Sequence, residues 1–256
     1  MSAKLNYKVE GQGKPIVLIH GLFGNLDNLG LLARDLRNDH QVISIDLRNH
    51  GESFHSEQHD YPLMAQDVTT CLAQLEIEPA VIIGHSMGGK VAMQLTQQIP
   101  DKIEQLIVLD MAPIAYNTRR HDNVFAGLFA VLEQQPSSRQ QAMKILEQHI
   151  ELEGVRQFLS KSLYKQDNHL TWRFNVQSLY NNYHSILGWQ SLPASDIATL
   201  FIKGGNSEYI QADYQAEIAR QFPKAKAHII ANTGHWLHAE KPTEVLRAIR
   251  KFITAG

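Results

Sequence analysis

The sequence has little of what several classes of protein need. It contains one cysteine, Cys71, which excludes an internal disulfide and any zinc site built from clustered cysteines. No apolar run approaches the roughly 18 residues that a membrane span requires, and residues 1–15 lack the apolar core of a secretory signal. Positive charge is not in excess, because 24 Lys and Arg stand against 26 Asp and Glu. We therefore expect a cytoplasmic protein that binds neither nucleic acid nor a membrane.

What the chain does contain is 256 residues of ordinary globular composition, 43% apolar and 20% charged. Short and nearly continuous apolar runs alternate with helical patterns, which is typical of parallel strands covered by helices on both faces. The sequence therefore predicts an α/β fold, with a doubly wound, mostly parallel sheet of about seven strands. Strands are expected at 4–10, 15–21, 41–46, 79–84, 106–110, 198–203 and 227–231, and helices at 61–75, 87–99 and 243–252.

One interval breaks this alternation. Between Asp110 and Ala198 no strand-like run is seen, and about 85 residues are too many for a simple crossover connection. The pattern instead predicts a helical cap, residues 113–196, inserted into a core made of residues 1–112 and 197–256. Helices are expected within it at 124–134, 139–151, 154–164 and 172–180.

The strongest chemical motif is GHSMG at residues 84–88, which follows an apolar strand and opens a helix. This G-x-S-x-G pattern in a strand–turn–helix context is the nucleophile elbow, in which a tight turn lifts a serine above the end of a strand. We therefore predict that Ser86 is a nucleophile. The alternative is a glycine-rich turn that serves only packing.

A serine hydroxyl is a weak nucleophile unless a base takes its proton. His235 lies in NTGHW, just past the last apolar strand, and the ends of parallel strands are where active-site loops gather. It also comes last in the chain, as the base does in serine hydrolases built on this sheet. His238 is a weaker candidate, because Glu240 and Pro242 predict a surface turn there.

Acyl transfer also needs hydrogen-bond donors for the developing oxyanion. The segment HGLFG, residues 20–24, ends an apolar strand. We predict that the backbone N–H groups of Leu22 and Met87 form the oxyanion hole, with Phe23 as the rival donor. The alternative for HGLFG is an ordinary strand-to-helix turn.

The acid that orients the histidine is harder to place. The loop after the next-to-last strand carries Asn206 and Ser207 where serine hydrolases of this type usually have Asp, and Glu208 is one step off. Asp110 ends the strand after the nucleophile helix, where a carboxylate following an apolar run is a poor choice for packing alone. We assign the acid to Asp110, with Ser207 or Asn206 as an additional polar orienter. The alternative is an aspartate that merely caps a turn.

These segments together resemble the α/β-hydrolase superfamily across nearly the whole chain. HGLFGNLDNLG, DLRNHGES, GHSMGG, VLDMAP, KGGNSEY and TGHW occur in this order. The combination is most similar to the YbfF-like bacterial esterases and the related abhydrolase-domain proteins of mitochondria. The resemblance implies that Ser86 and His235 are catalytic, with Asp110 matching the acid kept in that group. It also implies a serine esterase acting on small-to-medium acyl esters or acyl-thioesters, acyl-CoA among them.

Other functions are weighed against this one. A cofactor-free perhydrolase would use the same triad, and a binding module could keep the fold and sense a small ligand without hydrolysis. A metal hydrolase is poorly supported, because His235 and His238 form an H-x-x-H without the clustered carboxylates of a metal site. We therefore expect no metal and no cofactor, and a small-molecule ester or thioester as the binding partner.

The cap carries two groups of basic residues, one of them an arginine between two aromatic side chains. An arginine in that setting can hold a planar set of donors beside an apolar channel, which suits an anionic part of a substrate such as a carboxylate or a coenzyme A phosphate. The alternative is a solvated helix face. The candidate substrate-binding residues are Phe23, Arg119, Arg120, Trp172, Arg173 and Trp236.

Overall fold

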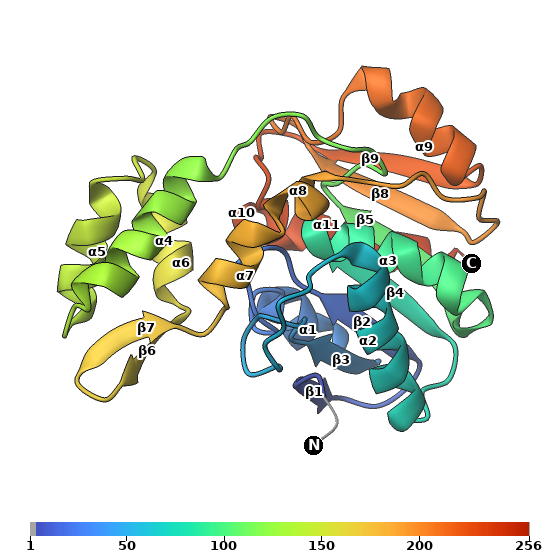
Figure 1. Cartoon of the computed structure of the whole chain (residues 1–256). Coiled ribbons are helices and arrows are strands. Elements are labelled where there is room, and N and C mark those ends of the chain that lie inside the picture. The colour runs from blue at the N-terminus through green and yellow to red at the C-terminus, as the bar shows by residue number, and fades with distance from the viewer. Residues whose placement is uncertain (1–3, 256) are drawn as a thin grey trace.

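A central sheet organises the protein, whose computed structural model describes residues 4–255 (Figure 1). Its seven strands lie in the order β1-β3-β2-β4-β5-β8-β9, and only β1 runs antiparallel to its neighbour. This confirms the predicted α/β sheet. The strands are β1 (Tyr7–Glu10), β2 (Pro15–Ile19), β3 (Gln41–Ile45), β4 (Ala80–His85), β5 (Ile103–Leu109), β8 (Thr199–Gly204) and β9 (Ala225–Ile230).

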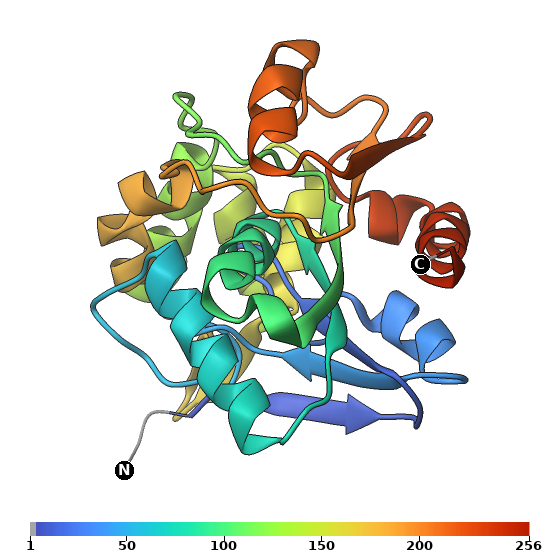
Figure 2. The same cartoon turned by 90° about the vertical axis from the view of Figure 1, so that its right-hand side faces the viewer.

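Helices cover both faces of this sheet, as the apolar strands require. On β2, Ile16 and Leu18 pack into one core with α1 (Gly30–Leu36) and α11 (Pro242–Thr254), and the alternate residues face the opposite core. That second core contains α2 (Tyr61–Gln74) and α3 (Met87–Gln98), which lie across the sheet from α1 and α11 (Figure 2). Each fully buried aliphatic side chain contributes roughly 1.5–3 kcal/mol relative to exposure. The short helices α9 (Gln215–Gln221) and α10 (Leu237–Glu240) flank β9 in the chain.

The chain between β5 and β8 forms a separate lobe beside the sheet (Figure 1). It contains α4 (Asp122–Gln134), α5 (Arg139–Glu147), α6 (Glu153–Ser160), α7 (Val176–Asn181) and α8 (Tyr183–Leu187). It also contains an antiparallel hairpin of β6 (Leu163–Gln166) and β7 (His169–Trp172). We call this lobe the cap, and in Figure 1 α7 and α8 lie between its outer part and the sheet.

The hairpin corrects the sequence analysis, which expected helices through 154–164 and 172–180 and no strand. Instead α6 ends at Ser160 and α7 begins at Val176. Each strand has only four residues, too short for a clear alternating pattern. The local signal is the turn pair Asp167-Asn168, where Asp167 adopts a φ of +52°.

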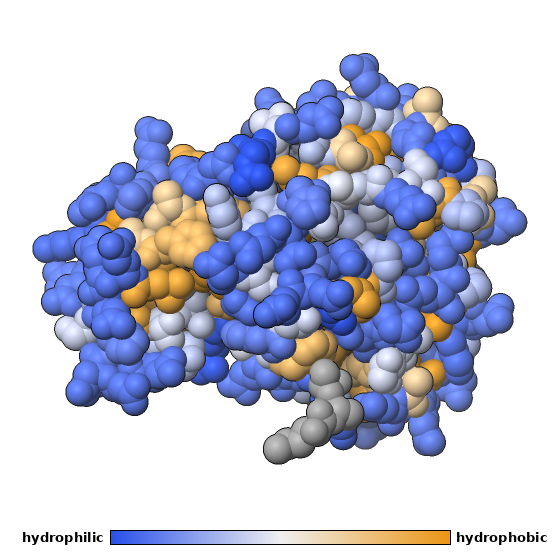
Figure 3. Space-filling view, in the orientation of Figure 1, coloured by the Kyte–Doolittle hydropathy of each residue, from blue (hydrophilic) through white to orange (hydrophobic). Residues whose placement is uncertain are grey.

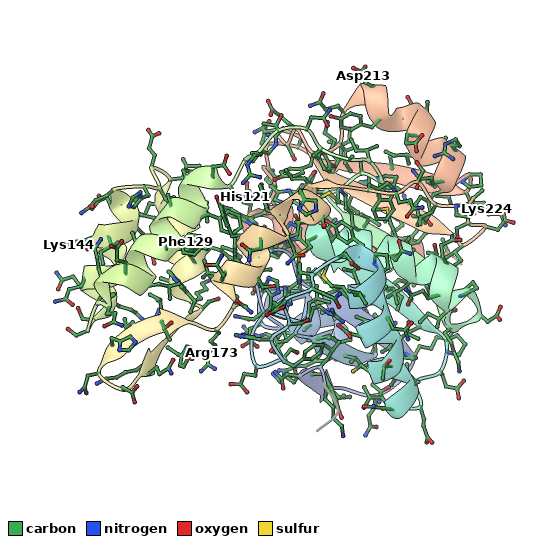
Figure 4. The ribbon with its side chains drawn as sticks, in the orientation of Figure 1. His121, Phe129, Lys144, Arg173, Asp213 and Lys224 are labelled. Atoms are coloured by element: carbon green, nitrogen blue, oxygen red, sulfur yellow. The ribbon has the colours of Figure 1, made fainter. Side chains whose placement is uncertain are left out.

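The surface of this face is mainly hydrophilic, with an apolar patch over the cap (Figure 3). Phe129, labelled in Figure 4, belongs to this part of the cap, and its ring centroid lies 5.4 Å from that of Tyr180. Within residues 4–255, no helix has both the length and the apolar character needed to cross a membrane.

Candidate active site

The turn between β4 and α3 consists of Ser86 alone, at φ +54° and ψ −122°. Glycines on either side make this turn possible. A Cβ atom on Gly84 would lie 2.2 Å from the carbonyl oxygen of Gly88, and one on Gly88 would lie 2.3 Å from that of His20. Such a backbone conformation costs about 1–3 kcal/mol. Close packing at the carboxyl end of the sheet keeps Ser86 in it.

Three side chains that the sequence singled out meet at this turn. The Oγ atom of Ser86 lies 2.8 Å from Nε2 of His235, and Nδ1 of His235 lies 2.7 Å from Oδ2 of Asp110. A carboxylate oxygen only accepts, so Nδ1 carries the proton and Nε2 is free to accept from the serine hydroxyl. The arrangement has the geometry of a nucleophile, a base and an orienting acid.

The carboxylate of Asp110 is fully buried and directly follows β5, at φ +52°. The backbone N–H of Gly204 donates to Oδ1 at 3.0 Å, and the hydroxyl of Ser207 donates to Oδ2. Ser207 thus supports Asp110 and does not replace it. Asn206 is exposed, and its backbone N–H donates to the carbonyl of Thr233 at 2.9 Å.

The two residues predicted to form the oxyanion hole lie beside Ser86. Leu22 and Met87 border a small cavity of about 30 Å³ together with Ser86. Met87 is the first residue of α3, so its N–H has no acceptor within the helix. The rival donor is occupied, because the N–H of Phe23 donates to Nε2 of His50 at 3.1 Å.

Aromatic rings surround the histidine. The ring of Tyr209 stacks on that of His235 with centroids 3.9 Å apart, and Nε2 of His85 lies 2.9 Å from the carbonyl oxygen of His235. Neither residue was predicted to be part of the site, although Tyr209 lies in the KGGNSEY segment. The surface turn expected at His238 is wrong: the ring is buried against His85, and burial lowers the pKa of His238 to about 3.

Among the described residues, no three His, Cys, Asp or Glu gather as a metal site would require.

A larger cavity of about 610 Å³ opens beside Ser86, between the end of the sheet and α6 of the cap. Phe23 and Trp236, both predicted to bind substrate, line this cavity, and Trp236 faces Phe158 of the cap with ring centroids 5.5 Å apart. The lining is mainly apolar or uncharged. Its ionised side chains are Asp27, Lys161 and Glu240.

The cap residues expected to bind substrate do not all reach these cavities. Arg173 lies apart from His121 (Figure 4) and links the cap to the loop after β3, where it forms an ion pair with Glu52 at 3.0 Å. Trp172 is buried inside the cap, where its indole N–H donates to the carbonyl of Leu128 at 3.1 Å. Neither residue lines the two cavities that adjoin Ser86.

The other two arginines differ from each other. Arg119 is half exposed and pairs with Asp122 at 2.7 Å, outside both cavities. Arg120 lines the small cavity, and its guanidinium pairs with Glu208 at 2.9 Å. Of the cationic cap residues named from the sequence, Arg120 is the one that adjoins Ser86.

Comparison with known proteins identifies the family of the chain. Residues 14–242 match the family model described as the alpha/beta hydrolase fold. The chain is 52% identical to "Esterase YbfF" of Escherichia coli, over 93% of this chain and 92% of that protein. It is 37% identical to the "sn-1-specific diacylglycerol lipase ABHD11" of Mus musculus, over 93% and 80%. A solved "Marine microorganism esterase" superposes with a TM-score of 0.92 at 35% identity, over 98% and 100%. The chain belongs to the α/β-hydrolase family.

Proposed function

We propose that the protein hydrolyses carboxylic esters through a covalent acyl-enzyme formed on Ser86. The single observation that carries the proposal is the hydrogen-bonded chain from Ser86 Oγ through the His235 ring to Asp110, with contacts of 2.8 Å and 2.7 Å. The names of its relatives support the same class of reaction, and the chain is accordingly a hydrolase of carboxylic esters.

The proposed reaction has two halves. In the first, Ser86 Oγ attacks the ester carbonyl carbon while its proton passes to Nε2 of His235. The buried carboxylate of Asp110 stabilises the imidazolium, and the N–H groups of Leu22 and Met87 donate to the oxyanion. The carbon–oxygen bond to the leaving group then breaks, and Nε2 returns the proton to the alkoxide.

In the second half, a water molecule takes the place of the alcohol. His235 accepts a proton from water as its oxygen attacks the acyl carbon. The bond to Ser86 Oγ then breaks, and the proton goes from Nε2 to the serine oxygen. One ester and one water thus give one acid and one alcohol, with the protein restored.

Small-to-medium acyl esters are the proposed substrates, and two cavities adjoin the nucleophile to hold their two parts. The cavity of about 610 Å³ lies within the range of sites that enclose small molecules. An acyl-thioester such as acyl-CoA is a second candidate. It is favoured by Lys161 in the lining of the large cavity and Arg120 in that of the small one, since both can pair with an anionic group.

The experiment that tests the proposal is hydrolysis of nitrophenyl esters by Ser86→Ala. We expect kcat to fall roughly 10³- to 10⁶-fold, with circular dichroism and Tm unchanged. Ser195→Ala is the control serine substitution, because Ser195 is buried just before β8 and lies outside both cavities. Near wild-type hydrolysis by Ser86→Ala would sink the proposal. The same assay distinguishes the two alternative functions from an esterase. A binding module would hydrolyse no ester, and a perhydrolase would require peroxide as a second substrate.

A further inference from the structure

Two buried histidines join the loops that follow β2 and β3. Nε2 of His20, in the first loop, accepts from the N–H of Leu47 in the second at 3.1 Å. Nε2 of His50, in the second loop, accepts from the N–H of Phe23 in the first, also at 3.1 Å. The ring centroids lie 5.1 Å apart, and the two residues are 1% and 0% exposed. Each loop therefore gives one imidazole acceptor and one amide donor to the other, a pairing we call the histidine clasp.

The partners of the other ring nitrogens fix the protonation of both imidazoles. Nδ1 of His50 lies 2.9 Å from the carbonyl oxygen of Arg48, and Nδ1 of His20 lies 2.7 Å from that of Gly21. A carbonyl oxygen only accepts, so each Nδ1 carries the proton and each Nε2 presents a lone pair. Burial lowers the pKa of both histidines, which keeps the rings neutral as this pattern requires.

The clasp acts on the residue next to the oxyanion donor. Phe23 adopts a φ of +60°, a conformation that is costly for a non-glycine residue. Its ring is buried against Phe125 and Phe174 of the cap, with centroids 5.3 Å away in each case. Its N–H already donates to His50, while Leu22 borders the small cavity with Ser86.

We propose that His20 and His50 are positioning residues that hold the loop after β2 so that Leu22 N–H, and not Phe23 N–H, faces the oxyanion. The proposal rests on the acyl-enzyme function above. Oxyanion donors act through preorganised geometry, so a loop that loses its clasp weakens the transition state more than the ground state. Neither histidine touches the reacting atoms.

A matched pair of substitutions at His50 separates the clasp from simple packing. In His50→Gln the amide oxygen reaches the place of Nε2 and keeps an acceptor for the N–H of Phe23. In His50→Asn the shorter amide reaches only the place of Nδ1, keeping a donor for the carbonyl of Arg48. Two quantities are measured: kcat and KM on a nitrophenyl ester, and the inhibition constant of a trifluoromethyl ketone. This ketone takes up Ser86 Oγ at its carbonyl carbon, its oxygen becomes an oxyanion, and the serine proton goes to His235.

We expect His50→Asn to lower kcat roughly tenfold to a hundredfold, less than the about 10²- to 10³-fold loss of an oxyanion donor itself. KM should stay within about threefold, and the ketone should bind more weakly by the same factor that kcat/KM falls. His50→Gln should keep both quantities within about threefold of wild type. The same pair at His20, His20→Gln and His20→Asn, should repeat the pattern.

Equal losses in His50→Gln and His50→Asn at an unchanged Tm would overturn the clasp, as would a fall in kcat without weaker ketone binding. If both asparagine variants fail to fold, the glutamine variants decide. A folded glutamine variant with more than about a tenfold loss in ketone affinity contradicts the proposal. If the wild-type protein forms no ketone adduct on Ser86, the proposed function fails. A normal wild-type adduct with equal variant losses overturns the clasp alone.

Discussion

The end of the sheet and the cap place their charged side chains differently. At the end of the sheet, Asp110 is fully buried and its carboxylate receives hydrogen bonds from His235, Gly204 and Ser207. On the cap, the side chains of Arg119 and Arg173 are 44% and 40% exposed and pair with carboxylates at the surface. A buried polar network depends on every member, whereas an exposed ion pair contributes about 0–1 kcal/mol. Changes at the end of the sheet should therefore be severe and changes on the cap mild.

The cap meets the site mainly through apolar contact. Phe158 faces Trp236 across the large cavity, and Phe125 and Phe174 hold the ring of Phe23. These contacts set the shape of the space beside Ser86 without bringing a strong charge to it. The difference between the two regions predicts that the residues at the strand ends carry the chemistry, and that the cap determines which substrates fit.

The largest effect expected from the comparison is the loss of the base. His235→Ala should lower kcat roughly 10³- to 10⁶-fold, because it removes the group that accepts the proton of Ser86 Oγ at 2.8 Å. Steady-state hydrolysis of a nitrophenyl ester measures it, with His228→Ala, an exposed position on β9, as the control. A loss of less than tenfold would break the contrast between the two regions.

The next effect tests which residue is the acid. Asp110→Asn should lower kcat about 10²- to 10⁴-fold, since an amide favours the wrong tautomer of His235 and cannot stabilise its cation. Ser207→Ala removes one donor to Asp110 and should cost less than about tenfold. The reverse order of losses would move the acid to the loop after β8.

A smaller effect sharpens the comparison on the cap side. Arg120→Ala should lower kcat/KM for an acyl-CoA about tenfold to a hundredfold, the value of one charge-assisted contact, and leave a neutral ester of equal acyl length nearly unchanged. Arg119→Ala is the control, because Arg119 lies outside both cavities and should change neither substrate. Equal losses on both substrates in Arg120→Ala would instead indicate damaged packing.

The smallest effect on turnover is expected at the interface between the sheet domain and the cap. Lys90 on α3 is fully buried, and its Nζ donates to the carbonyls of Leu187 and Gly188, at the end of α8, at 3.1 Å and 2.9 Å. Its Nζ also lies 4.8 Å from the ring centroid of Tyr116. Burial lowers the pKa of Lys90 from 10.5 to about 7. Between those two values the unfolded chain binds a proton that the folded protein lacks, so stability increases as pH rises.

The measurement compares Lys90→Met with wild type by chemical denaturation between pH 6 and 10. The free energy of unfolding of wild type should rise relative to the variant by up to about 1.4 kcal/mol per pH unit above pH 7. Esterase turnover at neutral pH should stay within about threefold. Parallel pH curves for the two proteins would show that Lys90 does not titrate in this range.

The sheet and the elbow could be predicted because their signals are local. A strand buried on both faces, such as β2, is apolar at every position, and GHSMG needs glycines where a Cβ would collide with backbone. The contact between His235 and Asp110 was also expected, since both follow parallel strands that end at the same edge. The contact occurs in the structure, and the catalytic roles stay predictions.

The side-chain contacts and the hairpin of the cap could not be predicted from the sequence, because they depend on residues far apart in the chain. Arg173 pairs with Glu52 in the loop after β3, which lies 121 residues earlier in the chain, and no pattern near Arg173 indicates that partner. The strands of the β6–β7 hairpin are too short for a periodic signal. The clasp between His20 and His50 was missed for the same reason: its hydrogen bonds link residues 27 positions apart.

The central claim, a covalent intermediate on Ser86, is tested most directly by trapping it. The protein is mixed with a nitrophenyl ester, and the reaction is quenched with acid within the first turnovers. The protein is then digested, and the masses of its peptides are measured by mass spectrometry. The account predicts one acyl group per chain on the peptide that contains Ser86, and none on the same peptide from Ser86→Ala. Turnover that proceeds with no acyl group on Ser86, or with the acyl group on another residue, would contradict it.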